Sequence, residues 1–312
     1  MKAAIIETSG VILETYHRLG KSVNFEGGES GNNSAPGGTI EHNDATQAHS
    51  MTNTRRDRIY RTDALVVGRS DLGETDRILT LYSPSRGKFR AVAKGIRRPQ
   101  SKLGPHLELF HQSRLMLSKG RELDIVTSAE TIDAHWALRT DLDAFGFSSY
   151  IVELLNQLTE DRQENPQVYD LLIRSLHLLA EGVNGFAVVR HYELVLMSLL
   201  GFRPQLVNCV RCGDEIVAGE NAFSFNLGGL LCPLCRSCDI SAPVLSINAQ
   251  KYIRVLDRSG LSAAVQLRPD PVTAQEIERT LSGYARHYAE RESRSLGVMK
   301  SIREWSPEYG AH

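Results

Sequence analysis

The chain has 312 residues, of which 41% are hydrophobic and 23% are charged, a composition typical of a folded globular protein. This length allows two or three domains, each with its own apolar core. No stretch approaches the roughly 18 to 20 apolar residues that a membrane helix needs, so no membrane association is expected. Glu7 and Glu14 interrupt the N-terminal apolar residues, which excludes a secretory signal and predicts a cytoplasmic protein.

The net charge of −1 hides an uneven distribution along the chain. Residues 51–137 hold 16 Lys and Arg against 10 Asp and Glu, a net charge of +6. Residues 1–50 carry −3, from 3 against 6, and residues 138–312 carry −4, from 17 against 21. The segment 51–137 is therefore the part of the chain on which a polyanion is expected to dock.

Residues 1–57 are predicted to be a disordered extension. The run from 20 to 55 is rich in Gly, Ser, Asn and Thr, and it has almost no large apolar side chains with which to offset the entropy of folding. Met51 precedes a short polar run that leads into the first predicted strand. We therefore expect residues 1–50 to be dispensable, or to reflect an incorrectly chosen start.

Residues 58–137 are predicted to form a small β-barrel. Five β-branched or aliphatic runs alternate with turn signals, and the longest interruption lies between the third and the fourth run. This pattern favours an OB-fold barrel, with an SH3-like barrel as the nearest competitor. The expected strands are 64–69, 75–83, 88–96, 107–118 and 123–135.

Helical periodicity begins at about residue 138 and predicts a helical domain in two parts, 138–205 and 241–304, with a tail at 305–312. Asn165 and Pro166 are a typical N-cap and first residue of a helix. Thr273 and Glu276 have the spacing of a capping box that opens a later helix. The fold class is therefore α+β and multidomain: an N-terminal OB-fold barrel and a C-terminal helical domain with an insertion.

The insertion, residues 206–240, contains all five cysteines of the chain. Two C-x2-C pairs, 19 residues apart, have the spacing of a four-cysteine zinc ribbon, and they predict one structural Zn²⁺ with no open position for a catalytic water. Disulfides and a redox-active pair are the alternatives. Cys238 repeats the spacing but lies beyond the second turn, so it is interpreted as a spare thiol. The predicted ligands are Cys209, Cys212, Cys232 and Cys235.

The stretch 86–102 contains seven basic residues and no acidic one. Alternation along a strand places three of these cations on one face, and three more follow on the adjoining loop. Such a surface can track a phosphodiester backbone, and nearby rings can either stack on bases or fill the core. The predicted contacts are Arg86, Lys88, Arg90, Lys94, Arg97, Arg98 and Lys102, and the aromatic candidates are Tyr82, Phe89, Phe110 and Trp136.

No catalytic motif stands out in the sequence. The chain lacks a Walker A loop, G-x-S-x-G, H-E-x-x-H and G-x-G-x-x-G, and its ten histidines are scattered. Asp141 and Asp143 precede a helix, where capping is their ordinary role. We expect a binding protein rather than an enzyme. The alternative is a zinc-ribbon scaffold whose basic patch binds acidic partner peptides instead of nucleic acid.

The chain resembles the bacterial recombination mediator RecO family over residues 60 to about 300. The most specific parts are GETDRIL (73–79), AKGIRR (93–98) and the cysteine turns around FSFNLGG (223–229). Leu109-Phe110 stands where the family pattern has Pro-Phe, and residues 1–50 have no counterpart.

The resemblance implies an OB fold, a helical domain and a zinc ribbon. It implies binding of single- and double-stranded DNA, annealing of complementary strands, and assistance to RecA on DNA coated by single-strand DNA-binding protein. The implied partners are RecR, RecF and the C-terminal tail of the single-strand DNA-binding protein, and nucleoid association follows. By the same match, the seven basic residues are DNA contacts and the four paired cysteines bind zinc.

Overall fold

The computed structural model describes the backbone of residues 58–305 and the side chains of residues 58–289. The predicted extension 1–57, the proposed start at Met51 and nearly all of the predicted tail lie outside the described residues. In the part of the chain that is described, no helix is both long and apolar enough to cross a membrane.

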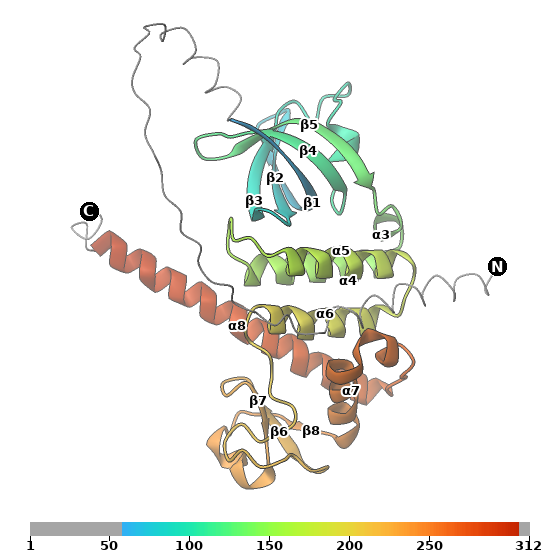
Figure 1. Ribbon diagram of the computed structural model, residues 1–312, viewed down its shortest axis with the longest axis vertical. Coiled ribbons are helices and arrows are strands. Elements are labelled where there is room, and N and C mark those ends of the chain that lie inside the picture. Colours follow the sequence, from blue (N-terminus) through green and yellow to red (C-terminus); the bar gives the residue numbers. More distant parts are fainter. Residues whose placement is uncertain (1–57, 306–312) are drawn as a thin grey trace, which may run out of the picture. The chain divides into compact units, whose positions relative to one another are not determined.

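Five strands close into a barrel in the order β1-β2-β3-β5-β4 (Figure 1). Strands β3 and β5 pair in parallel, whereas the other neighbours are antiparallel. This connectivity is that of an OB fold, which confirms the predicted class and excludes the SH3-like competitor. The strands are β1 (Ile59–Leu72), β2 (Asp76–Ser83), β3 (Gly87–Ala93), β4 (Gln112–Ser118) and β5 (Asp124–Asp133).

Strand β3 shows how the sequence alternation builds the barrel. Phe89, Ala91 and Ala93 point inward and are at most 2% exposed, while Lys88 and Arg90 point outward. The inward residues join those of the other strands in a barrel core that is separate from the larger core of the helices. Apolar burial on one face and charge on the other fix the register of the strand, because a slip by one residue would exchange them.

The predicted fourth strand, 107–118, begins five residues too early. Residues Gly104–His106 form a short 3-10 helix, and Phe110 has a φ of 67°, which no strand accommodates. Leu107 and Phe110 are fully buried. Leu107 belongs to the barrel core and Phe110 to the core of the helices, so their apolar character reflects core packing rather than a strand.

Three helices follow the barrel, preceded by a single turn, α3 (Ala137–Thr140). Each begins with a capping side chain that accepts a hydrogen bond from the backbone three residues on: Asp141, Asn165 and Asn184. The predicted roles of Asp141 and of Asn165-Pro166 are thereby confirmed. The helices are α4 (Leu142–Leu158), α5 (Pro166–Ala180) and α6 (Gly185–Leu199).

The capping box predicted at Thr273 and Glu276 is wrong. Helix α8 (Pro271–Trp305) is capped by Asp270, which accepts hydrogen bonds from the Val272 and Thr273 backbone N–H groups. The Glu276 carboxylate instead accepts from the N–H and hydroxyl of Ser246, the N-cap of α7 (Ile247–Ala264). Glu276 therefore serves a neighbouring helix, a contact that local spacing cannot reveal.

The cysteine-containing insertion forms a small sheet in the order β7-β6-β8 (Figure 1). Strands β6 (Asn221–Ser224) and β7 (Gly229–Leu231) form the predicted hairpin, and β8 (Val244–Leu245) pairs with β6. Phe223 is fully buried, and its ring lies 5.3 Å from that of Tyr284 on α8. The insertion thus shares the apolar core of the helices.

Candidate functional site

The turn after β3 is held by strand β2. The Asp76 carboxylate accepts hydrogen bonds from the Gly95 N–H at 2.7 Å and the Thr75 hydroxyl at 2.9 Å, and these bonds lower the pKa of Asp76. Gly95 has a φ of 64°, which glycine adopts without strain, and the Arg97 N–H donates to the Thr75 carbonyl. Hydrogen bonds to the start of β2 therefore fix the conformation of the basic turn.

Four of the seven predicted contacts are free at the surface. They lie on the outer face of β3 and along the following loop, all four side chains are exposed, and none has an ion-pair partner within residues 58–289. Exposed, unpaired cations attract a polyanion without first having to break an ion pair. This set, called here the free basic set, is Arg90, Lys94, Arg98 and Lys102.

Arg97, in contrast, is compensated. Its guanidinium lies 3.2 Å from the carboxylate of Asp71 and 3.4 Å from the Gly73 carbonyl. Asp71 also accepts a hydrogen bond from Arg77 at 2.9 Å, and this bond and the nearby Arg97 lower the pKa of Asp71. The stretch 86–102 contains no acid, but its free positive charge is smaller than the sequence suggests, because Asp71 from an earlier part of the chain pairs with Arg97.

Lys88 contacts the helices. Its ammonium donates to the carbonyls of Asn156 at 2.8 Å and Thr159 at 2.5 Å, and it lies 3.6 Å from the Asp161 carboxylate. Its side chain is only 13% exposed. These partners are at the C-terminal end of α4, where free carbonyls favour a cation. Lys88 therefore joins the barrel to α4. It shares the outward face of β3 with Arg90, as predicted, but its ammonium group is already bound by the helix and is not free for a ligand.

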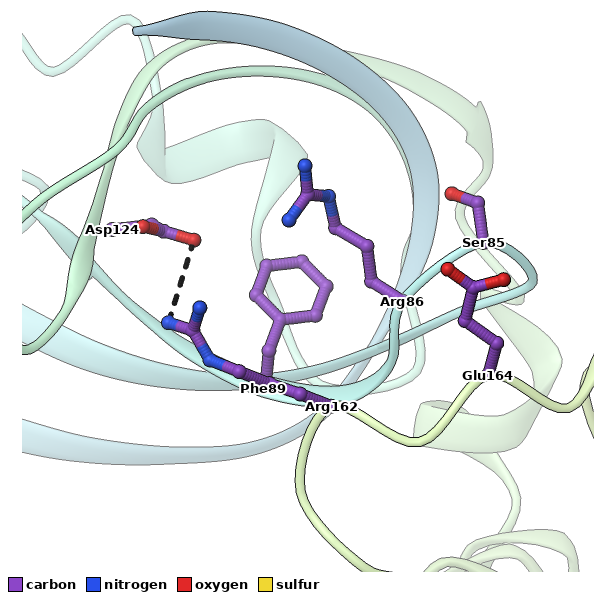
Figure 2. A pocket seen from close by; sticks show the side chains of 6 residues that line it. All are labelled: Ser85, Arg86, Phe89, Asp124, Arg162 and Glu164. Atoms are coloured by element: carbon purple, nitrogen blue, oxygen red, sulfur yellow. Dashed lines mark ion pairs between the residues drawn. The ribbon is translucent and has the colours of Figure 1, made fainter. Parts of the chain in front are cut away.

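Arg86 points into a small cavity of about 180 Å³ at one end of the barrel (Figure 2). Its guanidinium lies 3.7 Å from the ring centre of Tyr60, whose hydroxyl donates to Asp124 at 2.6 Å. Arg162 also approaches Asp124, at 3.9 Å. The cavity lining holds two arginines and two acids, Asp124 and Glu164, so Arg86 belongs to a charge-balanced cluster. The cavity is lined by Ser85, Arg86, Phe89, Asp124, Arg162 and Glu164.

The predicted base-stacking rings mostly belong to the core. Tyr82, Phe89 and Phe110 are each at most 2% exposed, so no base can stack on them in this structure. Trp136 is 68% exposed, with the Arg139 guanidinium 5.3 Å from its ring. Of the four aromatic candidates, Trp136 alone offers a ring to a ligand.

The four paired cysteines converge as their spacing predicts. Their sulfur atoms all lie within 4.8 Å of one another, and the Cys212 and Cys232 sulfurs are 3.8 Å apart. A tetrahedral ion with Zn–S bonds of about 2.3 Å has sulfur-to-sulfur edges of about 3.8 Å, so the cluster fits such an ion. Cys238 is exposed and lies outside the cluster. The choice of Cys235 over Cys238 agrees with this geometry.

Backbone N–H groups prepare the first cysteine turn. Gly213, with a φ of 83°, lets its N–H donate to the Cys209 carbonyl at 2.9 Å. Burial raises the pKa of the Cys209 thiol, but the N–H groups of Cys212, Cys232 and Arg211 outweigh this and lower it to about 6. Cys209 therefore favours the thiolate, which is the form that binds metal ions, whereas the pKa values of Cys212 and Cys235 are raised.

A second cluster of ligand-type side chains escaped the sequence analysis. Asp133, His135 and His177 also place their ligand atoms within 4.8 Å of one another. Asp133 and His135 are two residues apart at the end of β5, but His177 lies on α5, and nothing in the sequence joins it to them.

These features define the molecule as an OB-fold protein with a helical domain and a four-cysteine ribbon. Residues 58–135 match the family model described as Recombination protein O N terminal, and residues 139–297 match Recombination protein O C terminal. The chain belongs to this family, which confirms the resemblance that its motifs indicated.

Curated relatives carry the name DNA repair protein RecO. The protein of Roseiflexus sp. is 41% identical over 249 residues, which cover 80% of this chain and 88% of the relative. That of Desulforudis audaxviator is 36% identical over 244 residues, 78% of this chain and 97% of the relative. A Dehalococcoides mccartyi protein is 30% identical over 243 residues, 78% of this chain and 96% of the relative.

Proposed function

We propose that this protein is a DNA-binding recombination mediator in DNA repair that works without covalent chemistry. The observation that carries the proposal is the free basic set, which lies on an OB fold. OB folds bind single strands by tracking the phosphate backbone with such cations. Membership of the Recombination protein O family supports the role in repair.

The proposed mechanism is electrostatic. Lys94 and Arg98 both lie near enough to Asp76 to lower its pKa, so both cations lie on the side of the barrel where Asp76 holds the turn after β3. Cations that neutralise phosphates release condensed counterions and reduce the repulsion between two strands. Single- and double-stranded DNA are then both bound, and complementary strands anneal. Trp136 is the proposed ring for stacking a base.

The partners proposed are those that the family resemblance implies. RecR, RecF and the tail of the single-strand DNA-binding protein would bring this chain to coated DNA, where it assists RecA. We further propose that the cysteine cluster holds one structural Zn²⁺, because four thiolates at tetrahedral separation suit this ion and leave no ligand position open.

Fluorescence anisotropy of a labelled single-stranded oligonucleotide, across a salt series, tests the DNA interface. Replacing Lys94 and Arg98 by alanine should weaken binding to all sequences alike, and flatten the slope of log K against log salt by about 1.4. The matched control replaces Lys251 and Arg258, two exposed cations of α7, and should leave the slope unchanged.

An unchanged slope in the Lys94/Arg98 double variant would contradict the proposed interface. Binding of an acidic peptide with no affinity for DNA at low salt would instead support the scaffold alternative. Annealing of complementary strands, followed with a fluorophore–quencher pair, should fall in the same variant and persist in the control.

A further inference from the structure

We propose that Asp133, His135 and His177 form a second metal site, for one divalent ion of the Zn²⁺ class, where the barrel meets the helices. This site is distinct from the cysteine cluster and lies on different elements: the end of β5 and the last turn of α5. Two imidazoles and one carboxylate suit Zn²⁺, Co²⁺ or Ni²⁺, whereas Mg²⁺ and Ca²⁺ prefer oxygen ligands only.

The hydrogen bonds of His135 carry most of the argument. Its Nδ1 lies 2.8 Å from the Phe110 carbonyl, which can only accept, so Nδ1 carries the proton. In the neutral ring Nε2 then presents a lone pair, and this buried atom has no hydrogen-bond partner in the part of the chain that the structure describes. The side chain is only 1% exposed. An unsatisfied buried nitrogen needs a partner, and a metal ion supplies one.

The carboxylate of Asp133 is oriented toward the same point. Its Oδ1 accepts a hydrogen bond from the His135 backbone N–H at 2.7 Å, which leaves Oδ2 to face the two imidazoles. Oδ2 lies at hydrogen-bond distance from Nε2 of His177, 3.1 Å, and 3.8 Å from Nε2 of His135. Tetrahedral Zn²⁺ with bonds of about 2.0–2.1 Å has ligand separations of about 3.4 Å, which falls between these two distances.

The lone pair of His135 and the carboxylate oxygen of Asp133 are both acceptors, so without a cation or proton between them they repel. The two atoms are 3.8 Å apart, which is too far for a direct hydrogen bond to relieve the repulsion. A metal ion relieves it while the ring stays neutral, which is the form that ligates metals.

Two residues at the proposed site have left-handed backbone conformations. His135 has a φ of 41°, and Phe110, which accepts its hydrogen bond, has a φ of 67°. Left-handed conformations are uncommon outside glycine and carry a cost in free energy, and they gather at functional sites. Here they turn the His135 ring toward His177, with ring centres 4.8 Å apart.

A metal ion can reach the site directly from solvent. The side chains of Asp133 and His177 are 43% and 44% exposed, so an ion can enter and keep water in its remaining positions. A bound ion would join the end of β5 to α5 and so stabilise the barrel against the helices. Lys88 makes a separate contact of this kind with α4.

Cobalt titration of the full-length protein, prepared without a histidine tag, tests the site. Co²⁺ on nitrogen and oxygen ligands absorbs weakly in the visible region, whereas Co²⁺ that enters the cysteine cluster adds thiolate charge-transfer absorption. The two sites are therefore told apart in one spectrum. We expect one equivalent of the nitrogen and oxygen type, and Zn²⁺ should displace it.

Two variants of exposed ligands, His177→Gln and Asp133→Asn, should each weaken this cobalt binding at least about tenfold. The matched control is His106→Gln, a histidine outside the cluster that bonds to Thr131. Circular dichroism of the variants before cobalt is added checks that they fold. Zn²⁺ should also raise the melting temperature of the wild-type protein more than that of His177→Gln.

Absence of a saturable nitrogen-and-oxygen spectrum, with cobalt entering the cysteines alone, would overturn the proposal. Equal cobalt affinity in wild-type protein and His177→Gln would overturn it as well. Neither outcome depends on DNA binding, so the test is independent of the proposed function.

Discussion

The cysteine ribbon and the basic face of the barrel were both predicted from residue spacing, yet the structure treats them differently. In the ribbon, all four predicted residues meet at one point. On the barrel, four of seven predicted cations have no ion-pair partner among residues 58–289, while Arg86, Lys88 and Arg97 have partners elsewhere in the chain. The spacing of the cysteines is enough to bring the ligands together. Whether a cation is available to a ligand depends instead on which residues pack next to it in the folded protein.

The largest effect is expected from the ribbon. Replacing Cys209 or Cys232 by serine should abolish zinc binding at the cysteine cluster and destabilise the protein by about 4 kcal/mol or more, because metal binding is coupled to the folding of such sites. Zinc content measured by mass spectrometry and thermal unfolding would report both changes. Cys238→Ser is the control, and it should keep the zinc content and the stability of the wild-type protein. Loss of zinc in Cys238→Ser would show that the ligand set is wrong.

Neighbouring outward residues of β3 should behave in opposite ways. Lys88→Met removes a cation hydrogen-bonded to two carbonyls, and it should lower the free energy of unfolding by about 1.5–3 kcal/mol. Its salt slope for DNA binding should not change. Arg90→Met should leave stability unchanged and flatten the slope by about 0.7 for a single strand. Urea unfolding and anisotropy separate the two effects, and equal behaviour of the two variants would refute the distinction.

Glu193 on α6 is an ionisable group whose protonation is set by the residues packed around it. Burial raises the pKa of Glu193 to about 7, against the opposing effects of Arg190 and the Tyr150 hydroxyl. The folded protein therefore holds this proton more tightly than the unfolded chain, whose pKa is about 4.3. Between these values the free energy of unfolding should fall as pH rises, by at most about 1.4 kcal/mol per pH unit. Glu193→Gln should remove this contribution.

Two buried histidines act in the opposite direction within the same pH range. Burial lowers the pKa of His111 and of His191 to about 4, so their contribution to stability is lost as pH falls below about 6.5. Urea unfolding from pH 5 to 7 must therefore be compared between Glu193→Gln and the wild-type protein. A difference that stays constant with pH would contradict the raised pKa of Glu193.

The smallest effect distinguishes two adjacent arginines. Arg98→Ala should flatten the salt slope by about 0.7 for a single strand, and Arg97→Ala by less, because Arg97 is paired with Asp71. Asp71→Asn should release Arg97 and steepen the slope. Identical slopes for the two alanine variants, measured by anisotropy, would show that the ion pair opens on binding.

Much of the fold could be predicted because its signals are local. Alternation defined β3, Asn165-Pro166 defined the start of α5, and two C-x2-C pairs defined the metal ligands. Predictions failed where a residue serves a distant element. Glu276 caps α7 rather than its own helix, and Phe110 fills the core between barrel and helices instead of extending a strand.

The sequence by itself determined the barrel-forming alternation, the helix caps and the cysteine cluster, because neighbours in the chain set these features. Only the tertiary structure decided which cations are free, since Lys88 and Arg97 are compensated by groups up to 73 residues away. It also brought His177 on α5 to Asp133, the last residue of β5, and to His135, two residues further on. The pairing of charges and ligands across elements depends on packing, and packing brings together residues whose separation in sequence carries no signal.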